Sequence, residues 1–523
     1  MGRAGYALCA AVLTWSGTAA SQAPPAAVEA PPRSWQPADH DALEPHHLRT
    51  LAQAGSGLAL GSILYWLMMD RNIADWDNPE PEERFNGRAW RLDNNSLAVN
   101  FIAHPLMGAA AYSAGRANHH GVLTSFGYSL LTSFVWEFVL EFKEKVSVND
   151  MIVTPGTGVP LGEFFHKLGL YLDTAQHRNT ALDVARWTLS PGVAMDRAFD
   201  GRPPPYVVER DSLGFSRSIW HEFSVAAALD SVTSPGRPET ARGGVELQAR
   251  LVTLPGYLRP GAFGRFFYQA EVSDFAAGVE ASRHGAGMAL RADTLLAGYH
   301  AQRLLGSDAA PVGHAGTVGI SIAFDYLRSK ANDYAAFREA AALPEPAFDH
   351  HVPTRAEQYS AFHLPGAALD WQVMAPGLAL SVRARAHPDF AGLGAPAFYD
   401  FAAAHPEEKA KHILHRQGYF YGWGASGSLA GTLRLGPVRA SGAAFYGRYW
   451  SQDGLDRHVE RLTADVPVEG DVLFYSGAIG VEPPALPVTL GLRFGVRRWG
   501  SRVSEFERQG RISHRGFFLS HWF

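Results

Sequence analysis

The residues with the most chemical potential lie between Asn100 and Glu163, inside otherwise apolar stretches. Imidazole and carboxylate groups of His104, Glu137, Asp150 and Glu163 are borderline or hard ligands, so together they could hold a metal ion. No HExxH or similarly tight signature accompanies them, which makes them weak candidates for a metal or catalytic site. No cofactor is expected.

Two other interpretations of these residues remain open. A hydrolase would use Ser129 or Ser133 as nucleophile, His104 or His119 as base and a carboxylate to orient the base, but no GxSxG motif is present. The favoured interpretation is a buried network of hydrogen bonds and ion pairs between apolar helices, because polar groups buried there need partners. Its members would be Asn100, His104, Arg116, Glu137 and Glu163.

The elements that position these residues show helical periodicity within a domain expected at residues 48–200. Residues 50–69, 94–115 and 117–136 carry no charge. Their length would suit membrane helices, but their Gly, Ser, Asn and His content favours buried helices of a compact domain. His104 and Gly108 are one turn apart, so Gly108 should let a neighbouring helix approach. Residues 147–150 and 154–156 are expected to form turns and caps.

The same region resembles a bacterial family. The patterns N-x-x-x-H-P-x-x-G, W-E-x-x-x-E, S-x-N-D and T-P-x-x-G-x-x-x-G-E are similar to those of domain-of-unknown-function family 3943. The matching residues are Asn100, His104, Pro105, Gly108, Tyr112, Arg116, Trp136, Glu137, Glu141, Ser147, Asn149, Asp150, Thr154, Pro155, Gly158, Gly162 and Glu163. The resemblance implies an envelope protein and gives no activity.

Residues 215–523 alternate with period two, as strands do. Val488, Leu490, Leu492, Phe494 and Val496 share one face, while Arg493 and Arg497 lie on the other. Long alternating strands, aromatic residues near strand ends, and short turns alternating with long polar loops are typical of a transmembrane β-barrel. The final Phe523 resembles the terminal aromatic residue of Gram-negative outer-membrane barrels. We therefore expect an antiparallel barrel of about 12 strands.

Arginine predominates on the polar face of these strands. The expected lumen residues are Arg250, Glu271, Arg291, Asp325, Arg383, Arg385, Arg434, Arg439, Arg493 and Arg497. An open lumen lined in this way would favour anions. The alternative is a closed barrel in which acids or a helical plug pair with the arginines.

The N-terminus has the features of an export signal at residues 1–23: Arg3, a short apolar run and small residues before a cleavage point. A Pro- and Ala-rich linker is expected at 24–47. The single cysteine, Cys9, lies within the signal, so thiol chemistry is not expected of the mature chain. The net charge of −5 offers no basic surface for nucleic acid.

These features predict an α+β protein with an N-terminal helical domain followed by an antiparallel transmembrane β-barrel. Its expected location is the cell outer membrane, with the helical domain in the periplasm or barrel lumen. Expected partners are outer-membrane lipid and, during biogenesis, the barrel-assembly machinery. The expected role is structural, scaffold or channel-like; the alternative is a lipid-acting hydrolase with its site in the helical domain. Whether the chain is an enzyme is left open.

Overall fold

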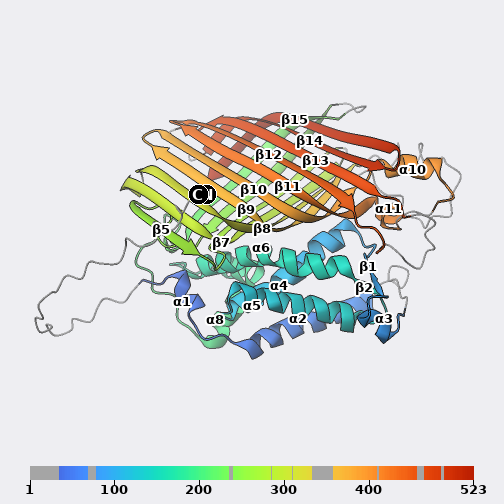
Figure 1. Cartoon of the computed structure of the whole chain (residues 1–523). Coiled ribbons are helices and arrows are strands. Elements are labelled where there is room, and N and C mark those ends of the chain that lie inside the picture. The colour runs from blue at the N-terminus through green and yellow to red at the C-terminus, as the bar shows by residue number, and fades with distance from the viewer. Residues whose placement is uncertain are drawn as a thin grey trace, which may run out of the picture.

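The computed structural model describes residues 34–68, 78–234, 239–283, 285–308, 310–331, 357–408, 412–455, 465–483 and 488–523. The expected signal peptide and most of the first half of the linker lie outside these residues. A helical layer and a β-barrel lie side by side, with the helices along the barrel wall rather than at its end (Figure 1). The predicted α+β class and the order of the two parts are confirmed.

Twelve antiparallel strands close the barrel, because the first pairs with the last: Ser224 of β3 lies opposite Trp522 of β15. The strands are β3 (Trp220–Thr233), β4 (Thr240–Val252), β6 (Val272–Ser282), β7 (Gly285–Ser307), β8 (Ala310–Ala331), β9 (Glu357–Ala375), β10 (Leu378–Gly394), β11 (Tyr419–Leu435), β12 (Val438–Ser451), β13 (Val468–Val481), β14 (Val488–Val503) and β15 (Phe506–Trp522). A short strand, β5 (Gly261–Phe267), precedes β6 and pairs with the far half of β7. Closure leaves no free strand edge in the barrel.

The two rims of the barrel differ. At the rim that carries the end of β15, β9 connects to β10 and β11 to β12 through two residues each, 376–377 and 436–437. The strand ends at the opposite rim that follow one another in the chain are farther apart in sequence: Ala331 and Glu357, Gly394 and Tyr419, and Ser451 and Val468. Between the second pair lie α10 (Phe398–Ala404) and α11 (His412–Gln417). We call these the short-turn rim and the long-loop rim. The opposite rim also has tight connections, such as 504–505, so the division into short and long is incomplete.

Alternation along the strands separates lumen from exterior as predicted. Leu490, Leu492 and Phe494 of β14 are 51%, 54% and 57% exposed on the outer face. Between them, Arg493 points inward, where its guanidinium donates to Asp230 of β3 at 2.5 and 2.9 Å. A lipid-facing apolar wall and a polar interior are the pattern of transmembrane barrels.

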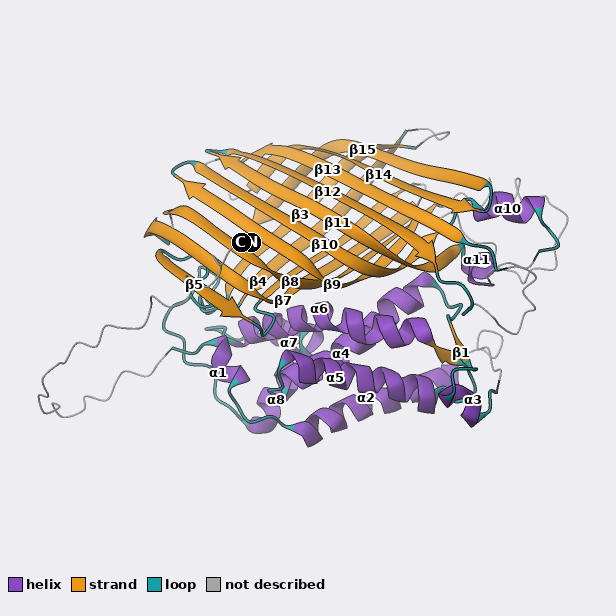
Figure 2. Cartoon of the chain, in the orientation of Figure 1, coloured by secondary structure: helices purple, strands orange, loops and turns teal. Residues whose placement is uncertain are grey.

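The helical layer is built around a 26-residue helix, α6 (Val148–Asp173). Around it lie α1 (Pro37–Asp41), α2 (His47–Met68), α3 (Pro81–Phe85), α4 (His104–Ala117), α5 (Val122–Val135), α7 (Thr180–Leu189) and α8 (Pro191–Asp200). Single π-helical turns at Val99–Ala103 and Trp136–Leu140 precede α4 and follow α5, and the short strands β1 (Trp90–Arg91) and β2 (Val146–Ser147) pair in parallel. Figure 2 shows the longer helices running beside the barrel wall.

Helix α6 rests on the outer surface of the barrel. Phe164 stacks on Phe275 of β6, with ring centroids 4.8 Å apart. Phe275 lies next to Asp274, which points inward to pair with Arg383 at 2.9 Å, so Phe275 points outward. The expected alternative of a helical domain in the lumen is therefore wrong for these helices. The strand side chains that α6 covers, such as Phe275, alternate with the lumen residues and lie on the outer face of the barrel wall.

The sequence prediction also differs from the structure at residues 154–156. The expected turn is instead part of the continuous helix α6, with Pro155 and Pro160 inside it. Packing explains why the helix continues: Gly108 of α4 lies so close to α6 that a Cβ atom there would be 1.8 Å from the Thr154 carbonyl oxygen. Glycine at Gly108 and Gly158 lets the two helices touch, and tertiary packing outweighs local breaker signals. The predicted close approach at Gly108 is confirmed.

The second half of the expected linker is also structured. Residues Pro37–Asp41 form α1, and His40 is buried. Helix α2 begins at His47, close to the boundary predicted at residue 48. Pro37, one of the prolines that suggested a spacer, occupies the first position of α1. Proline is favourable at that position of a helix.

Candidate functional site

The lumen of the barrel contains a dense network of paired charges. Asp370 accepts hydrogen bonds from both Arg250 and Arg385, and Arg385 also donates to Asp293 at 2.7 Å. Every arginine expected in the lumen has an acidic partner within 4 Å: Arg250, Arg291, Arg383, Arg385, Arg434, Arg439, Arg493 and Arg497. Glu271 differs from the prediction, because it lies in the break between β5 and β6. The paired interior supports the alternative in which acids balance the arginines.

A cavity of about 890 Å³ lies within this network. Each of the twelve barrel strands contributes to its lining, which includes Arg250, Arg383 and Arg497 as well as Asp274 and Glu280. The volume is in the range of pockets that hold small ligands. Because both charge signs line it, the cavity has no strong preference for an ion of one sign.

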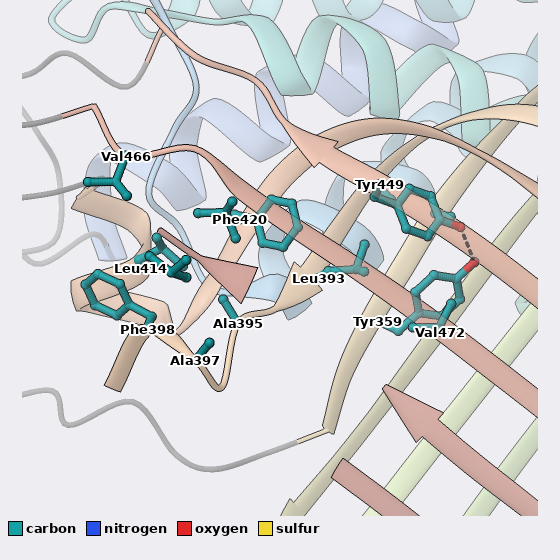
Figure 3. Packing of buried hydrophobic residues seen from close by; sticks show 14 of the residues in the cluster. Tyr359, Leu393, Ala395, Ala397, Phe398, Leu414, Phe420, Tyr449, Val466 and Val472 are labelled. Atoms are coloured by element: carbon teal, nitrogen blue, oxygen red, sulfur yellow. Dashed lines mark hydrogen bonds between the residues drawn. The ribbon is translucent and has the colours of Figure 1, made fainter. Parts of the chain in front are cut away.

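Apolar side chains fill the lumen toward the long-loop rim. We call this cluster the apolar plug; among its members are Tyr359, Leu393, Phe398, Phe401, Leu414, Phe420, Phe445 and Tyr449. Phe398, Phe401 and Leu414 come from α10 and α11, so a loop supplies part of it (Figure 3). The hydroxyl groups of Tyr359 and Tyr449 are 3.2 Å apart, and Tyr449 donates to Asp389 at 3.1 Å, which joins the plug to the charged network.

At the short-turn rim, residues 253–260 between β4 and β5 fold against the lumen. Leu254 and Tyr257 are buried in a cluster with Leu295 and Ala368. Gln372, two residues beyond Asp370 on the lumen face, donates to the Tyr257 hydroxyl at 3.4 Å. The cavity therefore lies between an apolar plug and an inward-folded segment.

Three of the four predicted site residues meet at the seam between the helical layer and the barrel. His104 Nε2 lies 3.6 Å from Asp150 Oδ2, and Glu137 accepts from the Ser147 amide at 2.9 Å. Asp93 joins them: a ligand atom from each of Asp93, His104 and Asp150 lies within 4.8 Å of the others. By position this triad could hold a metal ion.

Hydrogen bonds, however, occupy the carboxylates of this seam cluster. Asp93 Oδ1 accepts from Asn100 at 2.6 Å and from the hydroxyl of Tyr421, on β11, at 3.1 Å. Asp150 Oδ1 accepts from Asn149 at 2.9 Å. Buried hydrogen bonds of this kind stabilise one packing arrangement, and here they join the helices to the barrel. This arrangement supports the favoured structural interpretation.

Glu163 is separate from the other three candidates. It lies 13 residues beyond Asp150 on α6, which corresponds to about 20 Å along a helix. Its carboxylate accepts from Tyr112 and from Arg116 Nε, both at 2.8 Å, and lies 3.6 Å from Lys167 Nζ. Lys167 in turn donates to Ser273 of β6 at 2.8 Å, so this chain of contacts also links α6 to the barrel wall.

The hydrolase interpretation finds no matching geometry among the described residues. Ser129 donates to the Gly108 carbonyl at 3.0 Å, and Ser133 to the Asp150 carbonyl at 3.2 Å. The other candidate base, His119, lies 3.4 Å from Asp196 instead. Neither serine has the hydrogen bond to a histidine that would activate it.

The structure also brings together three histidines that share no motif in the sequence. The His40 ring lies 4.4 Å from that of His119 and 5.2 Å from that of His166, measured between centroids. The three positions lie far apart in the sequence and match no known metal-binding motif. The packing of α1, the α4–α5 connection and α6 brings them together. We call it the histidine cluster.

Fold and site thus define a closed twelve-stranded barrel with a helical layer on its outer wall. Residues 89–192 match the model of a family described as a domain of unknown function, DUF3943. This match, which covers a minority of the chain, confirms the resemblance seen in the sequence. A search of curated proteins found no significant match.

Solved structures similar to the chain are outer-membrane barrels. A Pseudomonas aeruginosa FadL homologue is 10% identical over 59% of this chain and 91% of its own, with a TM-score of 0.23. Omp33 of Acinetobacter baumannii is 9% identical over 58% and 98%, with a TM-score of 0.17. The translocator domain of the Neisseria meningitidis autotransporter NalP is 11% identical over 58% and 88%, with a TM-score of 0.20. Scores this low carry no argument about function.

Proposed function

We propose that this chain is an integral outer-membrane protein with a channel-like role, and that its lumen admits small polar solutes. The observation that carries the proposal is the cavity of about 890 Å³ in the lumen, lined by charges of both signs and bounded by the apolar plug. A cavity of this kind suits solutes that are uncharged and polar or that carry both charges. Passage then requires the plug to move.

The outer surface supports membrane residence. Outward side chains on strands remote from the helices are apolar and exposed, such as Leu229 at 62% and Phe517 at 69%. Trp423 and Trp450, paired on β11 and β12, are 41% and 47% exposed toward the long-loop rim, where an aromatic girdle would meet the interface. Outer-membrane lipid and, through Phe523, the barrel-assembly machinery remain the proposed partners.

The helical layer shares the bilayer with the barrel in this proposal. Helix α6 has 26 residues, or about 39 Å, which exceeds the roughly 30 Å of a hydrocarbon core. Among the described residues, one stretch, Val122–Leu140, is long and apolar enough by composition to cross a membrane. Helices that replace lipid along a barrel wall must themselves present an apolar face, and α2 does so with Leu60, Ile63 and Leu67 at 61%, 54% and 78% exposure.

Conductance in planar lipid bilayers tests the channel-like role. The double variant Phe398→Ala/Phe401→Ala removes two rings from the plug, so its conductance should rise several-fold over that of the unaltered protein. Phe517→Ala is the matched control, because it removes a ring from the lipid-facing wall and should leave conductance unchanged. Equal conductance in the plug variant and the control would contradict the proposal.

Ion selectivity provides a second readout. Asp370→Asn removes the carboxylate between Arg250 and Arg385, so the ratio of chloride to potassium permeability should increase. Asp400→Asn is the control, since Asp400 pairs with Arg508 at the rim rather than in the lumen.

A further inference from the structure

The histidine cluster contains ring nitrogens that are buried without hydrogen-bond partners. Both nitrogens of His40 and both of His166 lack a partner, although these residues are only 6% and 1% exposed. Asp41 Oδ1, beside them, is also buried and without a hydrogen bond. Buried polar atoms normally have partners, so three residues whose buried atoms lack them are a place where a ligand would supply the missing contacts.

The spacing of these atoms suits a metal ion. His40 Nδ1 lies 3.5 Å from Asp41 Oδ1, and one ligand atom from each of His40, Asp41 and His166 lies within 4.8 Å of the other two. In a tetrahedral zinc site the ligand atoms are about 3.3 Å apart, because each lies about 2.0 Å from the metal. Small side-chain adjustments would bring the three atoms to that separation.

The surrounding charges are compatible with a cation here. Arg116 lies 3.5 Å from Asp41 Oδ2 and pairs with Glu163 at 2.8 Å, so the charges of Arg116 and Lys167 face the two carboxylates of Glu163 and Asp41. His119, whose Nδ1 also lacks a hydrogen-bond partner, packs against the His40 ring with the centroids 4.4 Å apart.

Another group near the same histidines is less suitable. His40, His119 and Asp196 also lie within 4.8 Å of one another. The two oxygens of Asp196, however, accept hydrogen bonds from Arg49 and from Arg202. These two guanidinium groups would repel a cation, whereas Asp41 keeps one oxygen free of hydrogen bonds.

We propose that His40, Asp41 and His166 bind one divalent transition-metal ion of the Zn²⁺ class. Two imidazoles and one carboxylate are a common ligand set for such ions, and the mature chain expected from the sequence contains no competing thiolate. The ion would hold α1 against α6, because His40 and Asp41 come from the first helix and His166 from the sixth. This proposal is independent of the channel-like role.

Metal content of the full chain in detergent tests the site. The protein is purified without a polyhistidine tag, stripped with a chelator, dialysed, and titrated with Zn²⁺ while bound zinc is measured by mass spectrometry. One zinc ion per chain is expected. His40→Gln, Asp41→Asn and His166→Gln should each weaken binding at least tenfold.

Two control variants locate the ion. His104→Gln alters the buried histidine of the seam cluster, and His405→Gln alters a histidine beside two glutamates near the long-loop rim; both should bind zinc as the unaltered chain does. Loss of zinc in His104→Gln with retention in His40→Gln would overturn the proposal. Less than stoichiometric zinc in the unaltered chain would also overturn it.

Cobalt provides a readout that does not depend on folding of the variants. Co²⁺ added to the stripped, unaltered protein should give the visible d–d absorption of a low-coordinate nitrogen and oxygen site, and Zn²⁺ should displace it. Zn²⁺ should also raise the unfolding temperature of the unaltered chain and leave that of His166→Gln unchanged. A featureless cobalt spectrum would refute the site even if every variant failed to fold.

Discussion

At the scale of single residues, Glu163 shows how buried charges join the two parts of the molecule. It is fully buried, accepts from Tyr112 and Arg116, and lies beside Lys167. Lys167 reaches the barrel through Ser273 and the carbonyl of Ala270. The carboxylate of Glu163 is therefore shared by two cations, one of which holds α6 to the wall.

Glu163→Gln should destabilise the protein by about 3–5 kcal/mol, because it removes the buried carboxylate that Arg116 and Lys167 share. The free energy of unfolding, or the unfolding temperature in detergent, measures the effect. Glu505→Gln is the control, since Glu505 is 63% exposed and its loss should change stability by less than about 0.5 kcal/mol. Normal stability of Glu163→Gln would argue against a structural role and favour a functional one.

At the scale of elements, the contact between α4 and α6 depends on glycine. A Cβ atom on Gly158 would lie 2.5 Å from the Gly108 carbonyl carbon, so neither glycine can take a side chain without separating the helices. Close backbone approach of this kind is a feature of membrane helix pairs. It also places His104 and Asp150 within reach of each other, since these residues lie on the same two helices.

Gly108→Ala should lower the unfolding temperature of the protein by several degrees, because the added methyl group overlaps the Thr154 carbonyl oxygen. Gly127→Ala on α5 provides the matched control, since a Cβ atom there would meet nothing within 4 Å. The control should be neutral or slightly stabilising, as alanine favours helix over glycine. Equal effects of the two substitutions would refute the tight packing of α4 on α6.

The elements differ in how far the sequence could predict them. Alternation identified the strands and their faces, because period two is a direct consequence of the pleat. The helix through Pro155 could not be predicted, since it depends on a neighbour 47 residues earlier, Gly108, that allows close packing. Residue type alone places His104 and Asp150 together in the metal-site interpretation, whereas the histidine cluster depends on the fold, which brings positions 40, 119 and 166 together.

At the scale of the whole molecule, the position of the helical layer determines which surface meets lipid. Single-cysteine variants at Leu60 of α2 and Leu492 of β14 should both resist a water-soluble maleimide in intact membranes and react with a membrane-permeant one. The only cysteine in the sequence, Cys9, lies in the expected signal peptide, so the mature chain expected from the sequence has no thiol that would compete for the reagent.

A cysteine at Gln509, in β15 near the 504–505 turn of the long-loop rim, is the water-exposed control for this labelling and should react with both reagents. Rapid reaction of Leu60→Cys with the water-soluble reagent would show that α2 faces water. It would then favour the periplasmic placement of the helical layer over its placement in the bilayer.

The seam beneath α6 has a consequence for how the molecule is assembled. Ser273 of β6 and Thr294 of β7 project from the outer wall there, and their hydroxyl groups are 3.1 Å apart. Without α6 above them, these groups and the carbonyl of Ala270 would face acyl chains that offer no hydrogen bonds. These polar groups of the barrel wall are therefore shielded from lipid only when the helices cover them. We expect the helices to dock before or during insertion, while the pair β3–β15, whose outward Leu229 and Phe517 are exposed, can join last.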